Sequence, residues 1–144
     1  MNHKLGPDSF LIVDDNPDDV LAVRRCLKQA RIGNPLAHAE SGEEALQLLA
    51  AAAAEGQLPA LVLLDINMPG MKGGEVLLEI RNQLGLPQLP VLMLTSSNDD
   101  RDVLAAFKGK ADSYLNKPLD EDSLRKALER LRGQGVEVAV KAAG

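Results

Sequence analysis

The chain has 144 residues, a formal net charge of −5, and a composition of 45% hydrophobic and 26% charged residues. This length fits one domain with a sizeable core, and the composition is typical of a globular chain and excludes extended disorder. The negative charge, together with only two Phe, one Tyr and no Trp, disfavours nucleic-acid binding through a basic surface or through base stacking.

The amino-terminal part of the chain predicts a strand, a helix and a second strand. Phe10–Val13 is a short apolar run, and the following helix begins with Asn16 as its N-cap and Pro17 as its first residue. The turn-forming segment Gly33–Pro35 ends that helix. Leu36–Ala39 then forms the second strand.

The centre of the chain predicts an alanine-rich helix and the most apolar strand. The helix follows Glu40–Gly42 and ends at Gly56. Leu61–Leu64 is an uninterrupted apolar run, which is typical of a strand buried on both faces at the centre of a parallel sheet. The run stops at Asp65, and the turn-forming Pro69–Gly70 pair follows.

The rest of the chain repeats this alternation of helix and strand. In order, it predicts a helix over Val76–Leu84, a strand at Val91–Leu94, a helix around Val103–Phe107, a strand at Ser113–Leu115 and a helix over Leu124–Leu131. Five strand–helix units with short connections predict an α/β fold, in which helices cover both faces of a parallel sheet.

Chemically active side chains follow four of the predicted strands. They are Asp14, Asp15, Asp65, Thr95 and Lys117. Because the carboxyl ends of parallel strands share one edge of a sheet, where open α/β sheets bind ligands, we expect these side chains to lie together. Three neighbouring carboxylates repel one another unless a cation lies between them, and hard oxygen ligands suit Mg²⁺ best.

This combination of groups points to phosphoryl transfer. A bound cation would let Asp65 accept a phosphoryl group and form an aspartyl phosphate. Lys117 could pair with the phosphoryl oxygens, and the Thr95 hydroxyl could donate to them. Each residue also has a structural explanation: Asp14 and Asp15 as acids near a helix start, Asp65 and Thr95 as caps, and Lys117 as a turn residue. A shared site explains all five at once, whereas the structural explanations need separate coincidences.

Five short segments of the chain resemble the receiver domain of bacterial two-component response regulators. They are Ile12–Asn16, Ser41–Leu46, Leu64–Pro69, Leu94–Ser96 and Tyr114–Pro118. The resemblance covers residues 9–132 and implies a flavodoxin-like, doubly wound sheet of five parallel strands in the order 2-1-3-4-5. Residues 133–144 would then form a C-terminal tail, with no output domain.

The resemblance also implies the roles of the site residues. Asp65 would accept a phosphoryl group from the phosphohistidine of a histidine kinase, in a reaction that needs Mg²⁺ or, as a substitute, Mn²⁺. Asp15, Asp65 and the backbone carbonyl of Asn67 would bind the metal, and Asp14 would act mainly through a metal-bound water. The bond before Pro118 would be cis, which would aim Lys117 inward.

Thr95 and Tyr114 would form the switch in such a domain. Thr95 would move toward the phosphoryl oxygens, and the Tyr114 ring would enter the space that it leaves. The protein would be mainly a signalling switch that catalyses its own phosphorylation and dephosphorylation. One departure from the family's pattern is Lys72–Gly74, which could loosen the start of the helix that follows.

The chain is most similar, within this family, to short stand-alone receivers paired with phytochrome-type histidine kinases. We therefore expect such a kinase as its partner. A homodimer could form through the helix around Val103–Phe107, the strand Ser113–Leu115 and the last helix. The tail Val136–Val140 alternates at strand period and could add to a sheet edge instead. Only 12 residues follow Arg132, so we expect no direct DNA binding.

Other functions are disfavoured or remain open. A flavin or nucleotide binder of this fold would need a Gly- or hydroxyl-rich phosphate loop where Asp14 and Asp15 stand, and the chain has no P-loop motif. The single cysteine excludes a disulfide framework, and the absence of a signal peptide or a long apolar run predicts a cytoplasmic protein without a membrane segment. A pseudo-receiver that binds partners without being phosphorylated, and an intermediate of a phosphorelay, remain open.

Overall fold

The computed structural model describes residues 5–95, 110–136 and 138–139, and it contains a single parallel sheet of five strands. The strands are β1 (Phe10–Val13), β2 (Leu36–Ala39), β3 (Leu61–Asp65), β4 (Val91–Thr95) and β5 (Ser113–Asn116). Their order in the sheet is β2-β1-β3-β4-β5, and every neighbouring pair is parallel. The predicted fold class and strand order are therefore confirmed.

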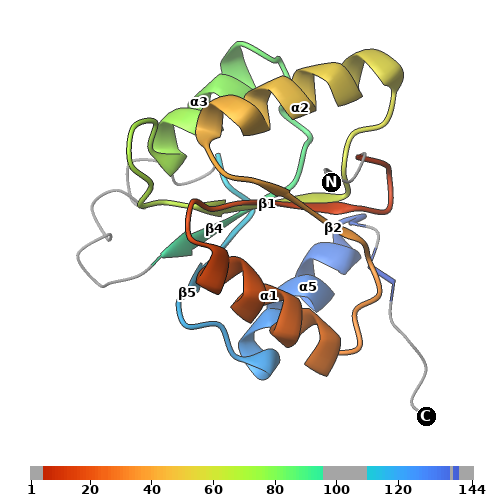
Figure 1. The fold of residues 1–144 in the computed structure, drawn as a ribbon. Helices are drawn as coiled ribbons and strands as arrows, with labels where there is room; N and C mark the ends of the chain where they lie inside the picture. Colours follow the sequence, from red (N-terminus) through yellow and green to blue (C-terminus); the bar gives the residue numbers. More distant parts are fainter. Residues whose placement is uncertain (1–4, 96–109, 137, 140–144) are drawn as a thin grey trace.

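Four helices in the described ranges cover the two faces of the sheet. They are α1 (Pro17–Gln29), α2 (Gly42–Glu55), α3 (Gly73–Asn82) and α5 (Glu121–Gly133). Figure 1 shows α2 and α3 on one face and α1 and α5 on the other. The helix predicted around Val103–Phe107 lies outside the described residues. None of the helices described is long and apolar enough to cross a membrane.

The core consists of two apolar clusters, one on each face of the sheet. Along β3, Val62 and Leu64 pack with α2 and α3, whereas Leu61 and Leu63 pack with α1 and α5. Because side chains alternate between the faces of a strand, a strand covered on both sides must be apolar at every position. The four residues are fully buried, as the uninterrupted run predicted.

Side chains cap the starts of three helices. The Asn16 side chain accepts the N–H of Asp18 at 2.9 Å, and Ser41 and Asp120 cap α2 and α5 in the same way. At α3 the N-cap residue Lys72 makes no such bond. The next residue, Gly73, packs so closely that a Cβ there would collide with the backbone oxygen of Asp65. The departure at Lys72–Gly74 thus leaves α3 without a side-chain cap but lets it approach β3.

The helix α1 ends earlier than predicted. It stops at Gln29 with Ala30 as its C-cap, before the segment Gly33–Pro35 that was predicted to end it. Arg31 adopts the left-handed conformation at φ 61°. The N–H of Ile32 returns to the carbonyl of Leu27 at 2.9 Å, which closes the helix end. Ile32 is buried in the core cluster that includes α1 and α5, and this burial favours the strained turn at Arg31.

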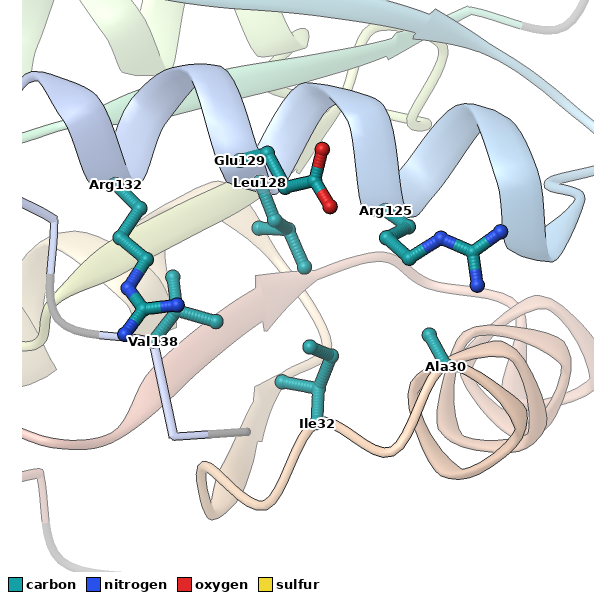
Figure 2. A pocket seen from close by; sticks show the side chains of 7 residues that line it. All are labelled: Ala30, Ile32, Arg125, Leu128, Glu129, Arg132 and Val138. Atoms are coloured by element: carbon teal, nitrogen blue, oxygen red, sulfur yellow. The ribbon is translucent and has the colours of Figure 1, made fainter. Parts of the chain in front are cut away.

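The described part of the tail lies against the segment between α1 and β2. The N–H of Gly33 donates to the carbonyl of Ala139 at 2.5 Å, and the N–H of Ala139 donates to Oδ1 of Asn34 at 2.7 Å. Val138 forms one wall of a pocket of about 160 Å³ between the end of α1 and α5 (Figure 2). Neither Val138 nor Ala139 belongs to a strand, so the extra strand over Val136–Val140 stays a prediction.

Candidate functional site

Three carboxylates meet at the carboxyl ends of β1 and β3, which are neighbours in the sheet. Asp14 follows β1 directly, and Asp65 is the last residue of β3. One carboxylate oxygen each from Asp14, Asp15 and Asp65 lies within 4.8 Å of the others. Asp14 and Asp65 are buried, whereas Asp15 is exposed, so the group is open to solvent on the Asp15 side.

Backbone N–H groups orient the two buried carboxylates. The N–H of Asn16 donates to Oδ1 of Asp14 at 3.0 Å, and the N–H of Asn67 donates to Oδ1 of Asp65 at 3.1 Å. Each bond closes a tight turn from a carboxylate to the N–H two residues later. The two turns hold the Oδ1 atoms and leave the Oδ2 atoms to face a common cation.

That cation is Lys117, which follows β5. Its Nζ atom lies 2.8 Å from Oδ2 of Asp14, 2.9 Å from Oδ2 of Asp19 and 3.4 Å from Oδ2 of Asp65. The bond between Lys117 and Pro118 is cis, as predicted. One ammonium thus stands against three carboxylates, with Asp15 close by, so the cluster carries excess negative charge.

The pKa values of Asp65 and Lys117 reflect their burial and their charged partners. Burial raises the pKa of the Asp65 carboxyl to about 6, the Lys117 ammonium opposes the rise, and the charge of Asp14 adds to it. Burial alone would lower the pKa of Lys117, but its hydrogen bonds to Asp14 and Asp19 raise it above the usual value. Lys117 therefore stays charged, whereas Asp65 takes up its proton at a higher pH than an exposed aspartate does.

Thr95 and Tyr114 lie on neighbouring strands beside this cluster. Thr95 is 1% exposed, and its hydroxyl donates to Oδ1 of Asn116 at 2.6 Å. A hydroxyl has one proton to donate, so Thr95 is bonded across to β5 rather than to Asp65. Its carbonyl accepts the N–H of Lys117 at 2.6 Å. Tyr114 is half-buried and packs on the core cluster under α2 and α3.

Sequence reasoning missed three residues at this edge of the sheet. Asp19 binds Lys117, and Asn116 accepts from Thr95. Nε2 of His38 on β2 lies 2.8 Å from the main-chain oxygen of Asp14. Asp19 follows Asp15 by four residues, and helical periodicity could have placed the two on one side. No sequence signal marks His38, and Asn116 is marked only as part of the segment Tyr114–Pro118. The contacts of both residues depend on how neighbouring strands are paired.

The donor set fits a hard divalent cation. Carboxylate oxygens from Asp14, Asp15 and Asp65 are close enough to share one ion, and each oxygen keeps a lone pair beyond the hydrogen bonds described above. Oxygen ligands that are partly open to water are the kind that Mg²⁺ prefers. Asn67, the fourth predicted ligand, lies in the turn two residues beyond Asp65.

Comparisons with known proteins agree on one family. The model of the response regulator receiver domain matches residues 10–129. The chain is 39% identical over 111 residues to the transcriptional regulatory protein AfsQ1 of Streptomyces coelicolor. This match covers 77% of the chain but only 45% of the length of AfsQ1.

Solved structures extend the similarity over nearly the whole chain. The bacteriophytochrome response regulator AtBRR is 31% identical, with a TM-score of 0.78, and the match covers 98% of this chain and 100% of AtBRR. The response regulator TrrA of Thermotoga maritima, solved in complex with Mg²⁺ and BeF, is 31% identical, with a TM-score of 0.69. That match covers 86% of this chain and 98% of TrrA.

Proposed function

The chain belongs to the response regulator receiver domain family of two-component signal transduction, and from this we propose that it is a switch phosphorylated on Asp65. The phosphoryl donor would be the phosphohistidine of a sensor histidine kinase. The observation that carries the proposal is the close grouping of the carboxylates of Asp14, Asp15 and Asp65. The Lys117 ammonium pairs with two of them, Asp14 and Asp65. An ordinary surface cluster would not bury two of the three acids.

In the proposed reaction a carboxylate oxygen of Asp65 attacks the phosphorus atom. The new O–P bond forms as the P–N bond of phosphohistidine breaks, and the electron pair of that bond stays on the imidazole nitrogen. No oxidant or further reactant is needed. Lys117 would pair with the phosphoryl oxygens and offset part of their charge.

We propose Mg²⁺, with Mn²⁺ as a substitute, as the cofactor. Asp15, Asp65 and the carbonyl of Asn67 would hold it, and Asp14 would act mainly through a bound water. When bound, the ion neutralises the charge that otherwise keeps an anionic donor away from the carboxylate. The close grouping of the acids supports this role, as does the Mg²⁺ and BeF bound to TrrA.

Thr95 and Tyr114 would report phosphorylation to a partner. Thr95 would exchange its bond to Asn116 for a phosphoryl oxygen, and the Tyr114 ring would then move inward. The backbone hydrogen bond from Lys117 to Thr95 ties this residue to the chain that follows β5. Thr95→Ala should leave Mg²⁺ binding nearly intact but uncouple phosphorylation from partner affinity. A mutant whose response equals that of the wild type would place the switch elsewhere.

The central test is phosphorylation by a small phosphodonor, followed by intact mass spectrometry. We expect one phosphoryl group on the wild type with Mg²⁺, none with a chelator and none on Asp65→Asn. Asp122→Asn, which removes an exposed carboxylate on α5, should be labelled like the wild type. Labelling of Asp65→Asn, or labelling in chelator, would contradict the assignment and favour a pseudo-receiver.

The partner is proposed to be a phytochrome-type histidine kinase, and the similarity to AtBRR supports this choice. Residues 9–132 would act as the receiver and residues 133–144 as a tail. A homodimer through the segment around Val103–Phe107 with β5 and α5, or through the tail, would carry the output without direct DNA binding. Further transfer of the phosphoryl group to a histidine would instead make the protein a phosphorelay intermediate.

Analytical ultracentrifugation can decide how such a dimer forms. Beryllofluoride serves as the phosphoryl mimic, and deletion of residues 137–144 removes most of the tail while keeping Val136, which is buried in the core. A tail-mediated dimer should dissociate on this deletion, whereas a dimer through β5 and α5 should persist. A monomer under all conditions would exclude the homodimer and leave only partner binding.

A further inference from the structure

The Lys117 ammonium is held by side chains from two different elements. A lysine ammonium has three N–H donors. One donates to Asp14, beyond the end of β1, at 2.8 Å, and one donates to Asp19, in the first turn of α1, at 2.9 Å. Oδ2 of Asp65 is 3.4 Å from Nζ, which is longer than the distance of about 2.7–2.9 Å that is typical of a charge-assisted hydrogen bond. The third donor is thus left on the Asp65 side.

The position of Asp19 is tied to that of Asp14. The N–H of Asn16 donates to the Asp14 carboxylate, and the carbonyl of Asn16 accepts the N–H of Asp19 at 3.1 Å. The turn that orients the Asp14 carboxylate therefore also starts the helix that carries Asp19. The two carboxylates approach the ammonium as a prearranged pair.

We propose that Asp19 is a positioning residue, which together with Asp14 holds the Lys117 ammonium so that its third N–H is directed at a phosphoryl group on Asp65. This inference rests on the proposed function, because it assigns Lys117 a phosphoryl contact. With the hydrogen bond to Asp14 but not the one to Asp19, the ammonium could rotate about that one hydrogen bond. A second anchor on α1 removes that freedom before the phosphoryl group arrives, which lowers the cost of ordering the lysine.

A simpler explanation would treat Asp19 as one more acid favoured at the start of a helix. Asp18 provides the matched control, because it lies in the same turn and has the same charge. Asp18 is exposed, and it is not one of the three carboxylates around Lys117. Asp18→Asn and Asp19→Asn thus remove equal charge from one helix turn, but only Asp19→Asn removes an anchor of Lys117.

The first measurement is the affinity for beryllofluoride at saturating Mg²⁺, by calorimetry. Because the Asp19 side chain is 38% exposed, Asp19→Asn should weaken binding by roughly threefold to tenfold relative to Asp18→Asn. The Mg²⁺ affinity without beryllofluoride should agree between the two variants within about twofold, since each loses the same charge. Equal beryllofluoride affinities would overturn the inference. Stronger binding by Asp19→Asn would also overturn it, because Asp19 would then compete with the phosphoryl group for Lys117.

The second measurement is the ¹H–¹⁵N spectrum of the lysine ammonium groups, without Mg²⁺ or beryllofluoride. A held ammonium exchanges its protons slowly, so we expect a Lys117 signal in the wild type and in Asp18→Asn. In Asp19→Asn the signal should broaden or vanish, although the fold and the melting temperature are retained. A signal of unchanged intensity would contradict the role of Asp19.

The two measurements separate this inference from the proposed function. If the wild type binds neither Mg²⁺ nor beryllofluoride, the proposed function fails, and the ammonium spectrum still decides whether Asp19 holds Lys117. If the wild type binds both and Asp19→Asn matches Asp18→Asn in each measurement, the proposed function stands and the positioning role fails.

Discussion

Two basic side chains beyond opposite ends of β5 organise the polar contacts of the molecule in different ways. Lys117 follows the carboxyl end of the strand, and Arg81 contacts Lys110 and Asp112 just before its amino end. Arg81 donates to the carbonyls of Lys110, Leu86 and Leu89 at 2.7 Å each. Lys117 instead faces three carboxylates.

The charge around Arg81 is balanced. Among the residues that the structure describes, its one carboxylate partner is Asp112, which lies 3.4 Å away and also accepts the N–H of Val91 at 2.8 Å. The other partners are neutral carbonyls, so the positive charge of the guanidinium is matched by the negative charge of Asp112. The planar fork of an arginine can serve several such acceptors at once. These contacts join α3 to the segments that precede β4 and β5.

The charge around Lys117 is unbalanced. Burial raises the pKa of Asp65 to about 6, the Lys117 ammonium opposes the rise, and the charge of Asp14 adds to it. The two clusters therefore differ in charge, since the one around Arg81 is balanced and the one around Lys117 carries excess negative charge.

The largest effect on stability should come from removing Arg81. Arg81→Ala would remove a donor from the carbonyls of buried Leu89, half-buried Leu86 and exposed Lys110. Asp112 would keep only the N–H of Val91 as a donor. We therefore expect a loss of about 2–4 kcal/mol in the free energy of unfolding. Urea denaturation would measure this loss, with the exposed neighbour Asn82→Ala as the control. Magnesium affinity of the folded variant should remain that of the wild type. A large loss of Mg²⁺ affinity would show that the two clusters are coupled.

A smaller effect is expected at Gly73, where α3 touches the strand end that carries Asp65. A Cβ at this position would collide with the backbone oxygen of Asp65 and lie 2.8 Å from Cα of Ile66. Gly73→Ala should therefore destabilise the fold by about 1–3 kcal/mol and slow the phosphorylation of Asp65. Gly133→Ala, where a Cβ would meet nothing within 4 Å, is the control. If Gly73→Ala changed stability but left phosphorylation at the wild-type rate, Asp65 would tolerate a displaced backbone.

The smallest effect should be a pH-dependent gain in the stability of the fold in Asp65→Asn. The folded pKa of Asp65 is about 6, above its ordinary 3.8, so the folded state binds more protons than the unfolded state between these values. The wild type therefore loses stability as the pH rises from about 4 to about 6 and does not regain it above, whereas an asparagine has no such loss. In chelator, Asp65→Asn should be more stable than the wild type by about 1–2 kcal/mol near neutral pH and not below about pH 4.

Asp122→Asn gives the opposite sign and serves as the control for this titration. Hydrogen bonds from Lys126 and Arg125 lower the pKa of Asp122, so its contribution to stability is present above its unfolded pKa and fades as the pH falls. Its removal should give no gain at neutral pH. If both variants were equally stabilised at neutral pH, the gain would come from the net charge of the protein and not from the buried position of Asp65.

The sequence by itself determined the layered fold and the edge at which the acids meet. Apolar runs of strand length, alternating with helical periodicity, leave few arrangements other than a parallel sheet between two layers of helices. The polar residues directly after such strands must then share one edge, which brings Asp14, Asp15 and Asp65 together. The cap at Asn16 was equally predictable, because its cap bond spans only two residues.

Only the tertiary structure decided which side chains hold these groups in place. Asp19 reaches Lys117 across 98 residues of chain, and His38 reaches the main chain of Asp14 through the pairing of β1 and β2. Arg81 meets its partners because α3 ends beside the starts of β4 and β5. The early end of α1 at Arg31 likewise follows from the burial of Ile32. Each of these contacts depends on the distance and rotation between packed elements, which local propensity and periodicity do not specify.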